Sequence, residues 1–214
     1  GNGQQLCVKI IHEKDQFIRE IQPMVFKLVH KPDEKYGDFW ETTIDISKKK
    51  TDDFGYSHST TTNWGKEGTY VYRYMLKSKN SNDIDWISDP FAREYGSGNM
   101  SAFTYGYKKY RWTKKERFWR TPNLRDLVVY EIMIHEFAND IDGTIEKLDY
   151  LCDLGVNCIE LMPLSNVPEM VDWGYLPSAH FGIDERFGNR RDFQRLVDEA
   201  HQRGIAVIMD VVYA

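Results

Sequence analysis

The chain has 214 residues, enough for one large domain or two modest ones, each with a core of its own. Its composition, 41% hydrophobic and 29% charged, is ordinary for a globular protein, and no apolar run reaches the roughly 18 residues of a membrane helix. Residues 1–120 carry 21 Lys and Arg against 16 Asp and Glu, whereas residues 121–214 carry 7 against 17. The change of sign predicts two domains. The acidic second part argues against nucleic acid as its ligand, because phosphate contacts require clustered Lys and Arg. With no long apolar run either, we expect neither nucleic acid nor membrane as a partner.

The first 120 residues have the pattern of a β-sandwich. The segment 69–75 alternates in a period of two, which places its three tyrosines together on one face of a strand. Segments 24–29 and 39–46 are further short strands rich in β-branched and aromatic residues. Polar turn segments separate the strands, and no amphipathic helix is expected before about residue 140. Several short strands joined by turns favour a sandwich.

The pattern changes near residue 127, where long apolar strands begin to alternate with amphipathic helices. This rhythm is typical of a parallel sheet covered by helices, because strands buried on both faces are almost continuously apolar. It leaves open a doubly wound sheet and a (β/α)8 barrel. No Gly-rich phosphate loop is present. The expected order is strand, helix, strand, long loop, helix, strand, over residues 127–134, 144–154, 156–162, 191–203 and 205–209.

Four groups of motifs in the second part resemble the opening of the catalytic barrel of glycoside hydrolase family 13, the α-amylase family. They occur in the family's order over nearly 90 residues. The resemblance implies that residues 121–214 form an incomplete (β/α)8 TIM barrel, running from its first strand to its third. The motifs are residues 129–132 with 135–137, 143–163, 173–177 with Phe181 and 186–188, and 197–204 with 210–213.

Motifs in the first part resemble the family 48 carbohydrate-binding modules that precede such barrels in branching and debranching enzymes. They are residues 39–41 with Ile44, 68–74 and 88–94. This resemblance implies an Ig-like β-sandwich over residues 1–120, and hence a multidomain β plus α/β protein. Its aromatics have two interpretations: they form a glucan-binding platform, or they fill the core of the sandwich. The candidates are Trp40, Trp64 and Trp86.

The resemblance implies that the parent protein is a retaining glycosidase or an α-glucan branching or debranching enzyme. Its substrates would be glycogen, starch or maltooligosaccharides, and no cofactor is implied. In the family the nucleophilic Asp, the acid/base Glu and a third Asp are associated with the fourth, fifth and seventh strands. The motifs here extend only to the third strand, so we assign no catalytic residue and expect the 214-residue chain to be inactive alone. The alternative function is a non-catalytic glucan-binding or interaction module.

The substrate-facing residues implied by the resemblance lie in the loop after the second strand. Tyr175 corresponds to the tyrosine that stacks on glucose at the −1 subsite, because an aromatic ring covers the apolar C–H face of a pyranose. Trp173 is a second candidate, with ordinary packing as the other interpretation. His180 either bonds a sugar hydroxyl or is a structural histidine, and Asp210 supports the floor of the pocket. Other polar residues are expected to be structural: Asp172 and Asp184 as solvated loop carboxylates, and His135 and Glu136 as loop anchors.

The three cysteines indicate neither a metal site nor a disulfide framework. Cys7, Cys152 and Cys158 are an odd number without metal-ligand spacing. Cys152 and Cys158 fall in apolar segments, where cysteine behaves as a small buried hydrophobe. This usage favours a reducing compartment, and we expect a cytoplasmic protein.

The last predicted strand has an exposed apolar edge if no further strand follows it. Residues 205–212 would then present unpaired backbone groups along a strongly apolar strand. We expect this edge to be covered, either by another copy of the chain or by the remainder of the enzyme.

Overall fold

The computed structural model describes residues 5–35, 37–47, 62–77, 84–168 and 173–213. It divides into two compact units, the first made of residues 1–92 and 96–107 and the second of residues 93–95 and 108–214. Residues 108–120, which the charge pattern grouped with the sandwich, lie in the second unit.

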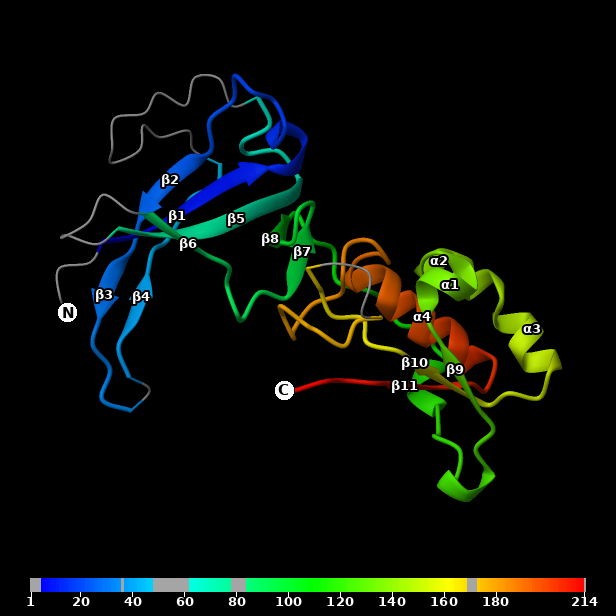
Figure 1. Cartoon of the computed structure of the whole chain (residues 1–214). Coiled ribbons are helices and arrows are strands. Elements are labelled where there is room, and N and C mark those ends of the chain that lie inside the picture. The colour runs from blue at the N-terminus through cyan, green and yellow to red at the C-terminus, as the bar shows by residue number, and fades with distance from the viewer. Residues whose placement is uncertain (1–4, 36, 48–61, 78–83, 169–172, 214) are drawn as a thin grey trace. The chain divides into compact units, whose positions relative to one another are not determined.

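The first unit is built around one long strand, β5, which pairs with three others. It pairs antiparallel with β1 along the whole of β1, with β8 on its other side, and with β6 at its end. In the larger sheet of this unit the order is β2-β1-β5-β8, and a separate hairpin joins β3 to β4 (Figure 1). The strands are β1 (Gln5–His12), β2 (Met24–Lys27), β3 (Val29–Lys31), β4 (Phe39–Glu41), β5 (Gly68–Lys77), β6 (Ile84–Ile87) and β8 (Met100–Tyr105); β7 (Glu94–Gly96) falls where the chain divides into the two units.

The two faces of β5 follow the predicted alternation. Tyr70, Tyr72 and Tyr74 lie in one cluster with β1 and β2 side chains, whereas Val71 belongs to a second cluster on the other face. Tyr70 is fully buried, and its hydroxyl donates to the carbonyl of Lys66 at 2.8 Å. The predicted strand 39–46 is shorter than expected, because β4 ends at Glu41.

The second unit contains a three-stranded parallel sheet of order β11-β10-β9. The parallel pairing predicted for the three strands is confirmed by their register, in which Ile159 lies between Tyr130 and Val207. One face of the sheet packs on the helices through Ile132, Ile159 and Leu161, which are buried against helical leucines. The elements are β9 (Val129–Ile132), α1 (Ile134–Ala138), α2 (Ile141–Glu146), α3 (Leu148–Asp153), β10 (Cys158–Leu161), α4 (Arg190–Gln202) and β11 (Ala206–Met209); short 3₁₀ helices cover Glu13–Asp15, Glu116–Phe118 and Leu124–Asp126.

The predicted helix 144–154 is interrupted. Lys147 separates α2 from α3, because its N–H bonds the carbonyl of Thr144, three residues back, instead of continuing the four-residue ladder. Cys152 lies beside the buried stripe of Leu148 and Leu151 and is exposed, so its predicted burial is wrong; Cys158, in β10, is buried as expected.

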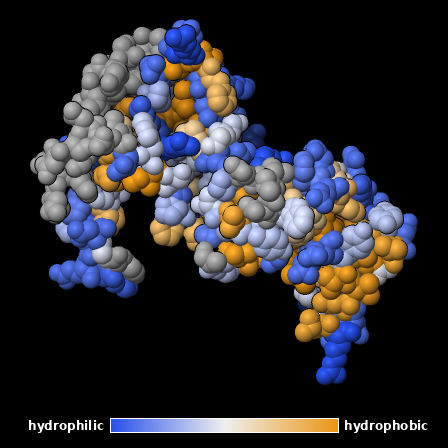
Figure 2. All heavy atoms as spheres, in the orientation of Figure 1, coloured by the Kyte–Doolittle hydropathy of each residue, from blue (hydrophilic) through white to orange (hydrophobic). Residues whose placement is uncertain are grey.

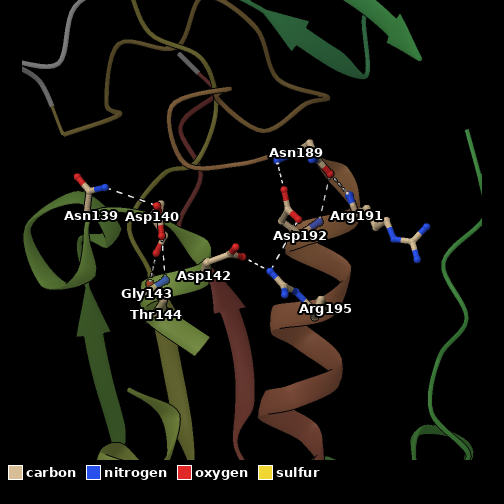
Figure 3. A network of polar contacts seen from close by, with 9 residues as sticks. All are labelled: Asn139, Asp140, Asp142, Gly143, Thr144, Asn189, Arg191, Asp192 and Arg195. Carbon is tan, nitrogen blue, oxygen red and sulfur yellow. Dashed lines mark hydrogen bonds and ion pairs between the residues drawn. The ribbon is translucent and has the colours of Figure 1, made fainter. Parts of the chain in front are cut away.

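Polar contacts join the first turns of α2 and α4 (Figure 3). Asp140 caps α2 by accepting the N–H of Gly143 at 2.8 Å. Asn189 and Asp192 form a reciprocal capping box at the start of α4. Arg195, one turn further along α4, forms an ion pair with Asp142 of α2. Both helices therefore begin at the edge where the parallel strands end, with their first turns linked.

Residues 110–119 pack along α4 through a buried carboxylate. Asp198 is 1% exposed, and it accepts hydrogen bonds from the hydroxyl of Tyr110 at 2.9 Å and from the hydroxyl and N–H of Thr113 at 2.8 and 3.0 Å. Burial, together with Asp198, raises the pKa of Tyr110 to about 12. Further along, the ring of Trp119 stacks on His201 at 4.0 Å.

We predict that Asp198→Ala destabilises the second unit by about 1–3 kcal/mol, because it leaves the half-buried donors of Tyr110 and Thr113 without their acceptor. Urea unfolding, followed by tryptophan fluorescence, measures the effect. Asp153→Ala, which removes an exposed carboxylate of α3, is the matched control and should change the free energy of unfolding by less than about 0.5 kcal/mol. Equal unfolding midpoints for the two variants would contradict the structural role of Asp198.

Candidate functional site

The carboxyl ends of β9, β10 and β11 lie at one edge of the parallel sheet, as in any sheet with parallel strands. Between β10 and α4 the structure describes residues 162–168 and 173–189, which carry most of the residues that the sequence assigned to substrate. In barrel enzymes this edge is where active sites are built.

Tyr175 and Asp210 are brought together at this edge. The Tyr175 hydroxyl donates to Asp210 Oδ2 at 2.6 Å, across 35 residues of sequence. Asp210 follows β11 directly, and its N–H bonds the carbonyl of Leu161 at 2.8 Å, which extends the pairing with β10 by one step. Tyr175 is half-buried, so its ring is not enclosed in a core.

The surroundings of Tyr175 are acidic. The hydrogen bond to Asp210 raises the pKa of Tyr175 to about 12, with smaller contributions from burial and from the charges of Asp210, Glu131 and Glu160. Glu131 and Glu160 are direct neighbours in the register of β9 and β10. They alternate with Ile132, Ile159 and Leu161, so they lie on the sheet face opposite the helices. This face therefore places three carboxylates around one phenol.

Gly174 makes the turn that separates Trp173 from Tyr175. Its φ is +91°, and a Cβ there would lie 2.4 Å from the carbonyl oxygen of Pro163, so a side chain does not fit. On one side of the turn Tyr175 reaches Asp210 after β11. On the other side the indole Nε1 of Trp173 donates to Glu136 of α1, which follows β9, at 3.2 Å. The two neighbouring aromatic side chains therefore bond different partners, one after β11 and one in α1.

Trp173 borders a hollow of about 360 Å³. The side chain is 54% exposed and sits at a φ of +48°, which is rare for a residue other than glycine. Its contact with Glu136 agrees with the predicted loop-anchoring position of that residue. The hollow is lined by Met133, His135, Glu136, Asn139, Trp173 and Arg186.

The prediction that Asp184 is a solvated loop carboxylate is wrong. Asp184 is fully buried and binds Arg186, whose Nε donates to Oδ1 at 2.7 Å and whose Nη2 donates to Oδ2. The backbone N–H of Arg186 also bonds Oδ1, at 3.0 Å. Such a carboxylate is stable without water because every contact is made by a charged or backbone donor. The spacing of an Asp and an Arg two residues apart is the sequence feature that could have indicated this pair. Asp172, the other carboxylate predicted to be solvated, lies outside the described residues.

His180 is exposed, and its ring lies 5.9 Å from the ring of Tyr213, three residues after Asp210. The role of His180 in binding a sugar hydroxyl stays a prediction, as do the roles of Tyr175, Trp173 and Asp210.

The first unit has a hollow of its own, of about 370 Å³. Its aromatic wall includes Trp40, Tyr72 and Tyr74, and the two tyrosine hydroxyls donate to Asp89 at 2.8 and 3.3 Å. Burial, with help from Asp89, raises the pKa of Tyr74 to about 12. Trp64 is buried in the core, so a binding platform that includes Trp64 is excluded, whereas Trp86 is 48% exposed.

Within the described ranges, no group of three or more His, Cys, Asp or Glu side chains is arranged to hold a metal ion. Among the same residues no helix is long and apolar enough to cross a membrane.

Comparison with known families gives a match to the α-amylase catalytic domain over residues 79–214, which is more than half of the chain. The chain belongs to the α-amylase family. It is 34% identical over 149 residues to the malto-oligosyltrehalose trehalohydrolase of Saccharolobus solfataricus, a match that covers 66% of this chain and 24% of that enzyme. It is 30% identical over 158 residues to the 1,4-α-glucan branching enzyme of Nitrosomonas europaea, covering 67% of this chain and 21% of that enzyme. This member of the α-amylase family thus spans about a quarter of the length of these relatives.

Solved structures of the family share the fold. The group B Streptococcus pullulanase SAP, in complex with maltotetraose, superposes with a TM-score of 0.67 at 21% identity, covering 98% of this chain and 30% of that one. A Salmonella typhimurium protein described as a putative α-amylase gives a TM-score of 0.65 at 21% identity, covering 96% and 29%. This likeness shows that the chain of the α-amylase family shares its fold with both proteins.

We predict that Tyr175 stays mostly protonated at pH 11 and that Asp210→Asn lowers its pKa towards 10, because a neutral amide accepts the Tyr175 hydrogen bond more weakly than the carboxylate and its lack of charge no longer opposes the phenolate. A pKa raised by folding adds stability below pH 10, and this stability is lost as the pH rises from 10 to 12. NMR titration of ¹³C-labelled tyrosine measures the pKa, and Tyr175→Phe assigns the signal. Titration of Tyr175 near pH 10 in the unaltered protein, or no change in Asp210→Asn, would show that the contact is absent in solution.

Proposed function

We propose that the complete protein is a retaining α-amylase-family enzyme that acts on α-glucans such as glycogen, starch or maltooligosaccharides. In this proposal the second unit is the opening part of the catalytic barrel, and the first is an Ig-like sandwich similar to family 48 carbohydrate-binding modules. The observation that carries the proposal is the Tyr175–Asp210 contact, which fixes an aromatic ring at the carboxyl ends of parallel strands in a chain of this family.

The geometry suits a sugar ring. An aromatic ring covers the apolar C–H face of a pyranose, and the hydrogen bond to Asp210 fixes the direction of the Tyr175 ring before substrate arrives. Glycoside cleavage passes through a transition state with oxocarbenium character, which carries positive charge. The carboxylates of Asp210, Glu131 and Glu160 make the surroundings negative and therefore favour that charge.

The chemistry itself requires two further carboxyl groups. Retaining glycosidases place a nucleophile and an acid/base about 5–5.5 Å apart across the scissile bond. The family resemblance assigns these groups to later strands of the barrel. The residues described here therefore serve to bind and orient substrate, and the 214-residue chain alone is inactive in this proposal. His180 would bond a hydroxyl at the rim, and the cytoplasm is the proposed location, supported by the three free cysteines.

A second candidate function is glucan binding without catalysis, through the first unit. The aromatic hollow beside Trp40, Tyr72 and Tyr74, with Asp89 at the tyrosine hydroxyls, favours it. Exposed Trp86, with the ammonium of Lys9 4.9 Å from its ring centre, is a further candidate contact.

We predict that Tyr175→Ala lowers kcat/KM of the full-length enzyme on amylose and maltooligosaccharides by about 100-fold, because the sugar at the reaction centre loses the surface that orients it. Tyr175→Phe keeps the ring and should lose about tenfold or less. Release or transfer of glucan chains, followed by reducing-end assay and chromatography, measures the effect.

Two other outcomes would contradict the roles assigned to residues in this proposal and would leave the α-glucan activity standing. Full turnover by Tyr175→Ala would show that the tyrosine is not needed to orient the sugar, and turnover by the 214-residue chain would show that the reacting groups lie within it. Glucan binding that is lost in Trp40→Ala, with no turnover by the full-length protein, would establish the second candidate instead.

We also infer that the outer edge of β11 is covered in the complete protein. Ile208 and Met209 are 40% and 37% exposed on this strand, which is the last in the sheet order, and Val211 beyond it is 46% exposed. Figure 2 shows apolar atoms gathered on the second unit in the region of this sheet.

We predict that the 214-residue chain self-associates through this edge, since an apolar strand with free backbone groups pairs readily with another. Light scattering over a dilution series measures the mass, and Ile208→Lys should shift the chain towards the monomer. A monomer at all concentrations would contradict the need for a cover.

A further inference from the structure

Residues 108–120, the basic segment, concentrate positive charge on the surface of the second unit. The segment has seven Lys and Arg residues and one acidic residue, Glu116, in a chain whose net charge is −5. All seven cationic side chains are exposed, and within the part of the chain that the structure describes none of them forms an ion pair. Like charges held this close repel one another, so the segment gains from an anionic partner. The seven are Lys108, Lys109, Arg111, Lys114, Lys115, Arg117 and Arg120.

The basic segment binds α4 through side chains that are spaced three residues apart. Two of these side chains donate to the buried carboxylate of Asp198. The other two contact the imidazole of His201, one by a hydrogen bond at 2.9 Å and one by ring stacking at 4.0 Å. A period of three is that of a 3₁₀ helix, and the backbone of residues 113–119 makes hydrogen bonds from residue i+3 to residue i. The anchoring side chains are Tyr110, Thr113, Glu116 and Trp119.

The row of side chains next to these anchors is entirely cationic. In a 3₁₀ turn, side chains three residues apart lie on one side with an axial rise of about 6 Å between them, which applies to Lys114 and Arg117. The remaining row is mixed, because the exposed rings of Trp112 and Phe118 alternate there with lysines. Since the anchors are directed to α4, the cationic row is directed to solvent. We define the cationic row as Lys108, Arg111, Lys114, Arg117 and Arg120.

The spacing of the cationic row matches an extended acidic peptide. In an extended chain alternate side chains point the same way and lie about 6.7 Å apart, close to the rise between Lys114 and Arg117. Carboxylates at alternate positions of such a peptide therefore meet successive cations of the row.

A short anionic ligand fits the charge distribution better than a long one. A nucleic acid or a membrane surface extends its negative charge far beyond the basic segment. There it would meet residues 121–214, which carry 7 Lys and Arg against 17 Asp and Glu. A peptide as short as the segment avoids this repulsion.

The exposed rings of the basic segment already have neighbours. The guanidinium of Arg117 lies 4.8 Å from the centre of the Phe118 ring, and Trp112 makes an edge contact with Tyr110 at 5.1 Å. Rings with such neighbours offer less free face for stacked bases than the open aromatic platforms of proteins that bind single strands. This contrast also favours a polypeptide over a nucleic acid.

We propose that the cationic row is a docking site for an extended acidic segment of a partner protein, with Asp or Glu at alternate positions. This site is independent of the function proposed above. The anchors on α4 hold the row in one arrangement before the partner arrives, so the backbone loses little freedom on binding. Each contact is a charge pair at an exposed group, so the affinity comes from several weak pairs and falls as salt is added.

The test measures the binding of a rhodamine-labelled peptide, in which Asp alternates with Thr, to the full-length protein by fluorescence anisotropy. Lys114→Gln combined with Arg117→Gln should weaken binding about tenfold, because two charge pairs of the row are lost. Lys109→Gln combined with Lys115→Gln removes the same charge from the mixed row and should weaken binding by about twofold or less. A peptide with Asn in place of Asp should not bind.

A second control removes the same charge from the first unit. Arg19→Gln combined with Lys27→Gln changes two exposed residues outside the segment and should leave binding unchanged. Urea unfolding should give the same midpoint for every variant, because all the altered side chains are exposed.

Three results would overturn the proposal. Equal losses in the two double variants of the basic segment would show attraction to positive charge in general and no role for the row. Tighter binding of a single-stranded oligonucleotide, or of anionic lipid vesicles, than of the acidic peptide would overturn the assignment to a polypeptide. Absence of peptide binding by the unaltered protein at low salt would show that the row does not serve as a docking site.

Discussion

The parallel register of β9, β10 and β11 is the constraint on which the rest of the second unit depends. Because Ile159 pairs with residues of both outer strands in one direction, all three strands end at the same edge of the sheet. The loops that follow are thereby brought together although they are distant in sequence. Asp210 continues the pairing by one hydrogen bond to Leu161, and this places its carboxylate where Tyr175 reaches it.

The helices support this edge from one side. The apolar face of the sheet packs on the leucines of α3 and α4, which leaves Glu131 and Glu160 on the opposite face. Capping at Asp140 and Asn189, together with the Arg195–Asp142 ion pair, fixes where α2 and α4 begin (Figure 3). A binding site is usually held in shape by the rigid helices and strands beneath its loops.

Much of the second unit could be predicted from periodicity, because long buried strands and the amphipathic α4 carry strong signals. The break at Lys147 could not, since it depends on one three-residue hydrogen bond that leaves no compositional mark. Exposure of Cys152 follows from which face of a short helix it occupies. In the first unit, the alternation in β5 was a reliable guide, whereas the shortness of β4 was not evident from its aromatic content.

The sequence predicted which residue types form the candidate site better than it predicted how their side chains contact one another. Tyr175 and Asp210 each belong to a recognisable sequence motif. Their contact, across 35 residues, depends on the tertiary structure and could not be predicted from either motif. The burial of Asp184 went unrecognised because a loop carboxylate is normally solvated, and only the adjacent Arg186 compensates for its loss of water. The partnership of Trp173 with Glu136 similarly links two segments that no local pattern connects.

The distance in sequence between Tyr175 and Asp210 also bears on the order of events during synthesis. The ribosome delivers the tyrosine well before the aspartate, and α4 must form between them. The hydrogen bond between them can therefore form only after the third strand has docked beside the second. The Trp173–Glu136 and Asp184–Arg186 contacts of the same segment do not involve β11, so they can form earlier than this hydrogen bond.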